Sequence, residues 1–219
     1  MDKPTDRRPI VIAGPSGVGK GTLWTMLRDR HPNTFSLSIS HTTRAPRTGE
    51  VRGVHYHYVT REEFKQLIDQ DAFIEHAEFG GNLYGTSREA TRPAVNKDDK
   101  IIVLDIDIEG VKQVKESHFN ARYVFIKPPS TPSEKADEPE EDRMRRTLEK
   151  RLRGRASESE EQIKKRLDRA LSEITYGIAL DDGKYKHFDT VIENNELETA
   201  FKNLESWVYG PKEESTTAQ

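Results

Sequence analysis

One glycine-rich segment, residues 14–22, constrains the fold more than any other part of this 219-residue chain. It follows the apolar run Ile10-Val11-Ile12-Ala13 and matches the pattern G-x-x-x-x-G-K, which between a strand and a helix is typical of a nucleotide phosphate loop. The glycines let backbone N–H groups turn toward a phosphate, and the helix amino terminus adds partial positive charge. An ordinary strand-to-helix turn is the alternative, which three glycines and a lysine in this register disfavour. The residues expected to bind ATP phosphates are Gly14, Pro15, Ser16, Gly17, Val18, Gly19, Lys20, Gly21 and Thr22.

The loop departs from the full pattern at Gly21, where Ser or Thr usually binds Mg²⁺. Thr22 is adjacent, but one residue along a helix turns a side chain by about 100°, so no direct metal-ligand role is assigned to it. We expect Mg²⁺ to be held by the nucleotide phosphates, by water and indirectly by Asp105 and Asp107, which end an apolar strand. The alternative for both acids is helix capping or plain solvation.

Strands and helices alternate along the chain, which predicts an α/β fold with a parallel sheet flanked by helices. Core strands are expected at 9–13, 101–107, 121–126 and 188–192, and helices near 20–30, 110–117, 140–153, 159–178 and 196–208, the last capped by Asn195. Residues 35–59 and 73–86 are expected to form short antiparallel strands and turns around a helix at 61–70, which opens with the capping box Thr60-x-x-Glu63. The helix at 140–153 places Met144, Leu148 and Leu152 on one face. We predict one domain over 1–219, with its core in 8–38, 97–128 and 170–208. An inserted mixed, β-rich lobe would occupy 39–96.

Composition excludes several classes of protein. The 35 basic and 38 acidic residues leave a formal charge of −3, which does not favour nucleic acid or an anionic membrane as partner. There is no cysteine, so thiolate chemistry and thiolate zinc sites are excluded. No apolar run is long enough for a membrane span, and the first residues do not resemble a secretory signal. We therefore predict a cytoplasmic protein, with a nuclear fraction left open. A monomer is expected, but the sequence does not fix the oligomeric state.

The inserted lobe contains the residue types that a phosphate acceptor needs. Arg44 and Arg47 lie three apart around a proline, and paired guanidinium groups suit a phosphate dianion. Tyr56 and Tyr84 could add phenolic donors. Taken singly, each of these would more often be a surface residue. The other candidates in the lobe are Ser40, Glu75, Gly85 and Thr86.

Together these segments resemble a guanylate kinase, in the P-loop nucleoside monophosphate kinase family. The resemblance is carried, in order, by GPSGVGKGTL, SISHTTRAPRTGEVRGVHY, FIEHAEFGGNLYGTS, IIVLDIDIEGV and EKRLRGRASESEEQIKKRL, and it covers nearly all of residues 8–208. It implies a P-loop kinase fold with a GMP-binding lobe and a helical lid. It also implies direct phosphorylation of GMP to GDP by ATP with Mg²⁺, in purine nucleotide metabolism and GMP recycling.

The resemblance also implies roles for individual residues. Those that would bind the GMP phosphate are Arg44, Arg47, Tyr56 and Tyr84; those that would recognise guanine are Ser40, Glu75 and Thr86; and Asp107 would contact the GMP end and a magnesium-bound water. A non-catalytic guanylate-kinase-like binding domain is the alternative, which the intact Gly14, Gly19 and Lys20 disfavour.

Residues 143–155, RMRRTLEKRLRGR, are strongly basic and would alone suggest a nucleic-acid patch. The acidic residues just before them oppose that interpretation. The resemblance implies instead a lid over 129–169, in which Arg151, Arg155 and Arg166 reach the transferring phosphoryl group or the ATP phosphates, alongside Lys20 and Arg44 as catalytic residues. A Pro-rich, acidic insertion at 130–142 departs from the family pattern, and we hypothesise that it alters lid closure.

Overall fold

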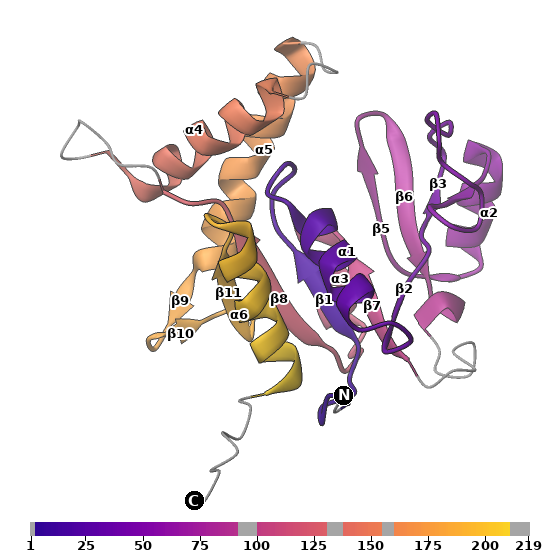
Figure 1. The fold of residues 1–219 in the computed structure, drawn as a ribbon. Helices are drawn as coiled ribbons and strands as arrows, with labels where there is room; N and C mark the ends of the chain where they lie inside the picture. The colour runs from indigo at the N-terminus through magenta and orange to yellow at the C-terminus, as the bar shows by residue number, and fades with distance from the viewer. Residues whose placement is uncertain (1–2, 92–99, 131–137, 155–159, 211–219) are drawn as a thin grey trace, which may run out of the picture. The chain divides into compact units, whose positions relative to one another are not determined.

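The computed structural model describes residues 3–91, 100–130, 138–154 and 160–210. The chain forms two compact units, coloured by residue number in Figure 1. One unit comprises Met1–Arg7, Gly14–Pro32 and Tyr123–Gln219, and the other comprises Arg8–Ala13 and Asn33–Arg122. In the described part of the chain, no helix is both long enough and apolar enough to cross a membrane.

The parallel sheet predicted from the alternation of elements is confirmed. Its strand order is β11-β8-β1-β7-β2, with bounds β1 Ile10–Ala13, β2 Phe35–Leu37, β7 Ile101–Asp105, β8 Arg122–Lys127 and β11 Thr190–Glu193. All four residues of β1 and the first four of β7 are buried, as continuous apolar runs require in a sheet covered on both faces. The antiparallel expectation for residues 35–37 is wrong: β2 pairs parallel with β7, because Phe35 is buried beside Ile101 and extends the apolar core.

The second unit also carries a four-stranded mixed sheet in the order β4-β3-β6-β5. Its strands are β3 His41–Thr42, β4 His57–Tyr58, β5 Phe73–Phe79 and β6 Asn82–Ser87. A tight turn through Gly80 and Gly81, both at positive φ, joins β5 to β6 in the long hairpin of Figure 1. β3 pairs antiparallel with β6 but parallel with β4, so the lobe is mixed as predicted, not wholly antiparallel.

The described residues of this unit also form two α-helices and a short 3-10 helix. α2, Arg61–Asp69, begins with the predicted capping box, in which the Thr60 and Glu63 side chains each accept a backbone N–H of the other. Its Phe64 packs into a small core with Phe73 and Leu83. α3, Ile108–Glu116, buries Ile108, Gly110, Val111 and Val114, and lies against β5. A short 3-10 helix spans Glu89–Thr91.

The first unit holds the remaining helices. α1, Lys20–Arg30, packs against α6, Leu197–Tyr209. α4, Glu140–Arg153, packs against α5, Glu160–Ile178, and buries the predicted stripe Met144, Leu148 and Leu152. A short hairpin, β9 Leu180–Asp181 and β10 Lys184–Tyr185, follows α5. The expectation that Asn195 caps the last helix is wrong, because α6 begins later, with Glu196 at the N-cap and no side-chain cap.

Candidate functional site

The glycine-rich segment forms a curled loop between β1 and α1. Gly17 and Gly19 have φ values of 87° and 102°, a conformation that favours glycine, and Gly19 is the N-cap of α1 without any side-chain cap. The N–H groups at the start of α1 are therefore left for a ligand to satisfy. Lys20 Nζ donates to the Gly14 carbonyl oxygen at 2.7 Å, so the lysine folds back across the loop. This geometry is that of a phosphate cradle.

The glycines of the loop are also required by close packing. A Cβ atom on Gly14 would lie 2.3 Å from the Ile126 carbonyl oxygen, and one on Gly19 would lie 2.5 Å from Asn194 Nδ2. The Cβ position on Gly21, in contrast, meets nothing within 4 Å. The absence of a side chain at Gly21 thus has no packing cause in the described structure.

Two of the predicted lid arginines contact this loop within the first unit. Arg151, on α4, donates to the Val18 carbonyl oxygen at 3.3 Å and to the Asn194 carbonyl oxygen at 2.8 Å. Arg166, on α5, donates to Ser16 Oγ at 3.1 Å. Arg155 lies outside the described residues.

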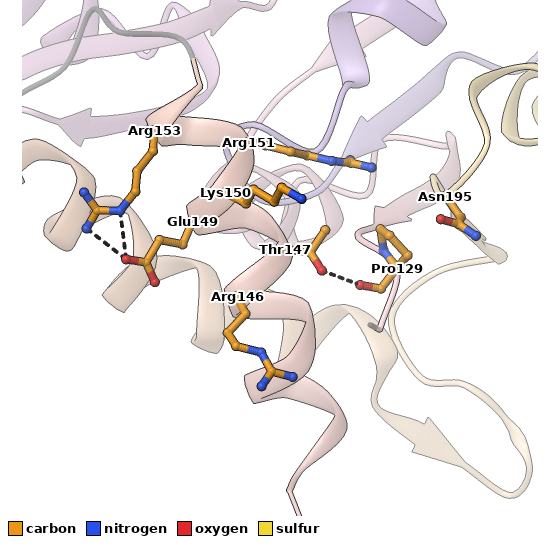
Figure 2. Close-up of a pocket in the computed structure, with 8 residues that line it drawn as sticks. All are labelled: Pro129, Arg146, Thr147, Glu149, Lys150, Arg151, Arg153 and Asn195. Carbon is orange, nitrogen blue, oxygen red and sulfur yellow. Dashed lines mark hydrogen bonds and ion pairs between the residues drawn. The ribbon is translucent and has the colours of Figure 1, made fainter. Parts of the chain in front are cut away.

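A hollow of about 430 Å³ lies beside the loop, lined by Gly17, Val18, Gly19, Thr22, Lys150, Arg151, Gly154, Asn194, Asn195 and Leu197. Asn194 is buried, and its amide donates to the Val18 carbonyl oxygen at 2.7 Å. A second hollow, of about 820 Å³, shares Lys150, Arg151 and Asn195 with the first. Figure 2 shows Lys150 and Arg151 extending from α4 on the side of Asn195, while Glu149 and Arg153 pair with each other away from it.

The second unit brings the predicted guanine-recognition residues together. Glu75 on β5 is 5% exposed and lies opposite Thr86 on β6, whose hydroxyl is 3.1 Å from Ser40 Oγ. Burial raises the pKa of the Glu75 carboxyl to about 7; hydrogen bonds from Thr86 oppose this rise, and the charge of Asp107 adds to it. A buried carboxylate beside two hydroxyls can accept two N–H donors and offer hydroxyl donors to a carbonyl oxygen.

A second cluster in this unit surrounds Arg44. Its guanidinium lies 5.5 Å from the Tyr56 ring centre, and Tyr56 in turn meets Tyr84 edge-on at 6.1 Å. The guanidinium donates to Glu50 Oε1 at 2.9 Å, which holds the pKa of the Glu50 carboxyl at about 2. Arg47 joins the cluster through its backbone N–H, which donates to Glu50 Oε2 at 2.7 Å, while the residue itself is exposed.

Asp105 is the last residue of β7 and Asp107 lies two residues beyond it, so both acids lie at the carboxyl end of the strand, as predicted. The Asp107 carboxylate caps α3 by accepting the Gly110 N–H at 2.8 Å, so the capping alternative holds for this residue. Asp105 is exposed at the carboxyl end of its strand. Over the described ranges, no three His, Cys, Asp or Glu side chains gather closely enough to hold a metal ion by themselves.

Comparison with known proteins identifies the family. The guanylate kinase family model matches residues 6–210. The chain belongs to the guanylate kinase family. A guanylate kinase of Schizosaccharomyces pombe is 45% identical over 201 residues, covering 91% of this chain and 89% of the relative. One from Synechococcus sp. is 44% identical over 198 residues, covering 90% and 92%. The crystal structure of guanylate kinase from Anaplasma phagocytophilum has a TM-score of 0.61 at 29% identity and covers 91% of this chain and 83% of that one.

Membership of the guanylate kinase family confirms the resemblance drawn from the motifs. The structure adds residues that the motifs did not single out, above all Glu50, Gly110 and Gln113. Glu50 could have been suspected from its position three residues after Arg47, the spacing of a tight turn. Gly110 and Gln113 act on β5 from a different element, and no local pattern marks such a contact.

Proposed function

We propose that the chain transfers the γ-phosphoryl group of ATP directly to the phosphate of GMP, giving ADP and GDP. The observation that carries the proposal is the buried Glu75 carboxylate beside Ser40 and Thr86, in a chain whose phosphate loop keeps its glycines and Lys20. A carboxylate can accept guanine N1–H and the 2-amino group together, and the hydroxyls can donate to O6. Adenine lacks these groups, and a mismatch of this kind can reject a substrate by about 10⁴-fold.

On the donor side, the loop residues Gly14 to Thr22 surround the ATP phosphates, the N–H groups at the start of α1 donate to them, and Lys20 neutralises the β- and γ-phosphates. Arg151, Arg155 and Arg166 place further positive charge on the phosphates and on the transferred group. Arginines in such a role can supply about 10³- to 10⁵-fold in rate. Arg166 supports this assignment by donating to Ser16 in the loop.

On the acceptor side, Arg44, Arg47, Tyr56 and Tyr84 bind the GMP phosphate. Burial raises the pKa of the Tyr56 hydroxyl, so it stays a donor at neutral pH. Gly85 brings β6 close to its neighbours, because a Cβ there would lie 3.0 Å from the Phe73 ring and 3.1 Å from the Glu75 carbonyl oxygen. Asp107 contributes its charge near the base-recognition carboxylate.

We further propose that Mg²⁺ accompanies ATP. The donor set fits an ion held mainly by phosphates and water, because Gly21 offers no hydroxyl and Asp107 already caps α3. Asp105 and Asp107 would hold the ion indirectly, through water. When bound, the ion would neutralise charge on the phosphates.

No side chain has to act as a nucleophile. The GMP phosphate is largely dianionic at pH 7, so its oxygen attacks the γ-phosphorus, the bond to the ADP oxygen breaks, and ADP leaves with that electron pair. The protein aligns the groups, neutralises their charge and excludes water that would hydrolyse ATP.

That the protein is a monomer in the cytoplasm stays a prediction, and so do the domain boundaries given above.

The test is ADP release from ATP and Mg²⁺ with GMP, AMP, UMP or CMP as separate acceptors. We expect release with GMP and little with the others. Release with another monophosphate would refute the assignment of the base pocket. A folded protein that binds GMP and releases no ADP would instead support the non-catalytic binding domain.

A further inference from the structure

A side chain of α3 lies along the edge of β5 next to Glu75. Among the strands of the described residues, in the order β4-β3-β6-β5, β5 pairs with β6 alone. On its other side, Gln113 of α3 makes two hydrogen bonds to the backbone of His76: Nε2 donates to the carbonyl oxygen at 2.8 Å, and Oε1 accepts the N–H at 3.0 Å. One amide therefore satisfies both backbone groups of the residue that follows Glu75.

The strand needs such support at this point because its register is irregular. Phe73 pairs with Ser87 and Glu75 pairs with Thr86, so β5 advances two residues while β6 advances one. A bulge of this kind bends the strand and changes the direction of the following side chain. The direction of the Glu75 carboxylate consequently depends on what holds the backbone just after the bulge.

The same face of α3 also contacts the carboxylate itself. Gly110 lies three residues before Gln113, on the same side of the helix. A Cβ atom on Gly110 would lie 2.8 Å from Glu75 Oε2 and 3.3 Å from its Cδ. The Glu75 carboxylate thus lies directly against the backbone of α3, and a Cβ atom at position 110 would force the carboxylate to shift.

We propose that Gln113 and Gly110 are positioning residues for guanine recognition. Gln113 holds the β5 backbone after the bulge, and Gly110 leaves the space that the carboxylate occupies. Neither residue touches the base; both act through Glu75. The inference rests on the proposed function, in which Glu75 accepts the guanine N–H groups.

The main test compares Gln113→Met with Val114→Ala. Methionine keeps the length of the side chain but makes neither hydrogen bond, whereas Val114 is a fully buried neighbour on α3 whose truncation weakens the same helix. We expect Gln113→Met to raise KM for GMP about 10-fold, with kcat and KM for ATP within about twofold. Val114→Ala should lower Tm without that rise. An equal KM for GMP in the two variants would overturn the proposal.

A double-mutant comparison separates this inference from the proposed function. If Gln113 acts through Glu75, Glu75→Gln combined with Gln113→Met should have the same KM for GMP as Glu75→Gln alone. If the fold-changes in KM for GMP of the two single variants multiply in the double variant, Gln113 acts independently of Glu75. An unchanged KM for GMP in Glu75→Gln alone would instead refute the role of Glu75 and, with it, the premise of this inference.

Gly110→Ala keeps the proposal testable if Gln113→Met does not fold. Alanine favours a helix more than glycine does, so α3 itself should tolerate the change. The added methyl group should displace the Glu75 carboxylate and raise KM for GMP, with KM for ATP unchanged. A normal KM for GMP in a folded Gly110→Ala protein would contradict the role given to Gly110.

Discussion

GMP affinity should weaken steeply as the pH falls from 8 to 6, because burial raises the pKa of the Glu75 carboxyl to about 7. Only the ionised carboxylate can accept both guanine N–H groups; a protonated carboxyl places its own O–H against one of them. Roughly nine-tenths of the groups are ionised at pH 8 and roughly one-tenth at pH 6. Since apparent affinity scales with the competent fraction, the Kd for GMP should be about 10-fold weaker at pH 6.

The GMP phosphate also titrates near pH 6, at about the value typical of phosphate monoesters, so the wild-type profile alone is ambiguous. Glu75→Gln provides the control, because it has no titrating group at position 75 and keeps the same phosphate site. The assay is calorimetric titration of GMP, without ATP, into both proteins at several pH values. The ratio of the two Kd values isolates the contribution of Glu75. A ratio that stays constant between pH 6 and 8 would refute the reasoning.

The same carboxyl makes a prediction for stability. Its folded pKa of about 7 lies above the ordinary value of 4.5, so the folded state binds the proton more tightly than the unfolded chain. Stability should therefore fall as the pH rises from about 4.5 to 7, and the full cost should be present above 7. At 1.36 kcal/mol per pKa unit, the cost is about 3 kcal/mol. Denaturant unfolding at pH 8 should find Glu75→Gln more stable than wild type; equal stability at pH 8 would contradict the prediction.

Three further substitutions test other parts of the molecule. Lys20→Met should reduce kcat by at least about 100-fold with an unchanged unfolding midpoint, because the ammonium acts on phosphate charge; full turnover in the folded variant would refute that role. Gly177→Ala should destabilise the protein by about 2–3 kcal/mol in denaturant unfolding, because the added Cβ would lie 2.3 Å from the Phe125 ring; an unchanged midpoint would show that the ring moves freely. Gly21→Ser should be tolerated, because a Cβ atom there meets nothing within 4 Å. The added hydroxyl should lower the Mg²⁺ concentration needed for half-maximal activity. An unchanged Mg²⁺ requirement would mean that the hydroxyl does not reach the ion.

Local patterns predicted the elements that depend on local physics. The capping box at Thr60 and Glu63, the buried stripe on α4 and the strand-loop-helix order around Lys20 all follow from contacts within a few residues. The start of α6 was predicted less well. Asn195 has the side chain of a good N-cap, but α6 begins two residues after it, and Asn195 lines a hollow instead.

Contacts between distant segments were not predictable in this way. Residues 35–37 resemble the following lobe in composition, so the sequence grouped them with its antiparallel strands. Their membership of the parallel sheet follows from their pairing with β7, a contact between distant segments. The hydrogen bonds between the Gln113 side chain and the His76 backbone join residues 37 positions apart. One residue is on a helix and the other on a strand, and the sequence periodicity of each element does not show that the two pack together. The motifs therefore point to candidate substrate-binding groups more readily than to the groups that hold those candidates in place.

Arg44 illustrates why the holding groups matter for function. Its guanidinium donates to the Ala45 carbonyl oxygen at 2.7 Å and to Glu50, whose other oxygen accepts the Tyr58 hydroxyl at 2.8 Å. These bonds fix the side chain before any ligand arrives, which reduces the ordering cost of binding. They also neutralise its charge, because the Glu50 carboxyl, with a pKa of about 2, stays ionised at neutral pH. We infer a division of labour in which Arg44 gives the GMP phosphate a fixed direction and the exposed Arg47 supplies positive charge that attracts it.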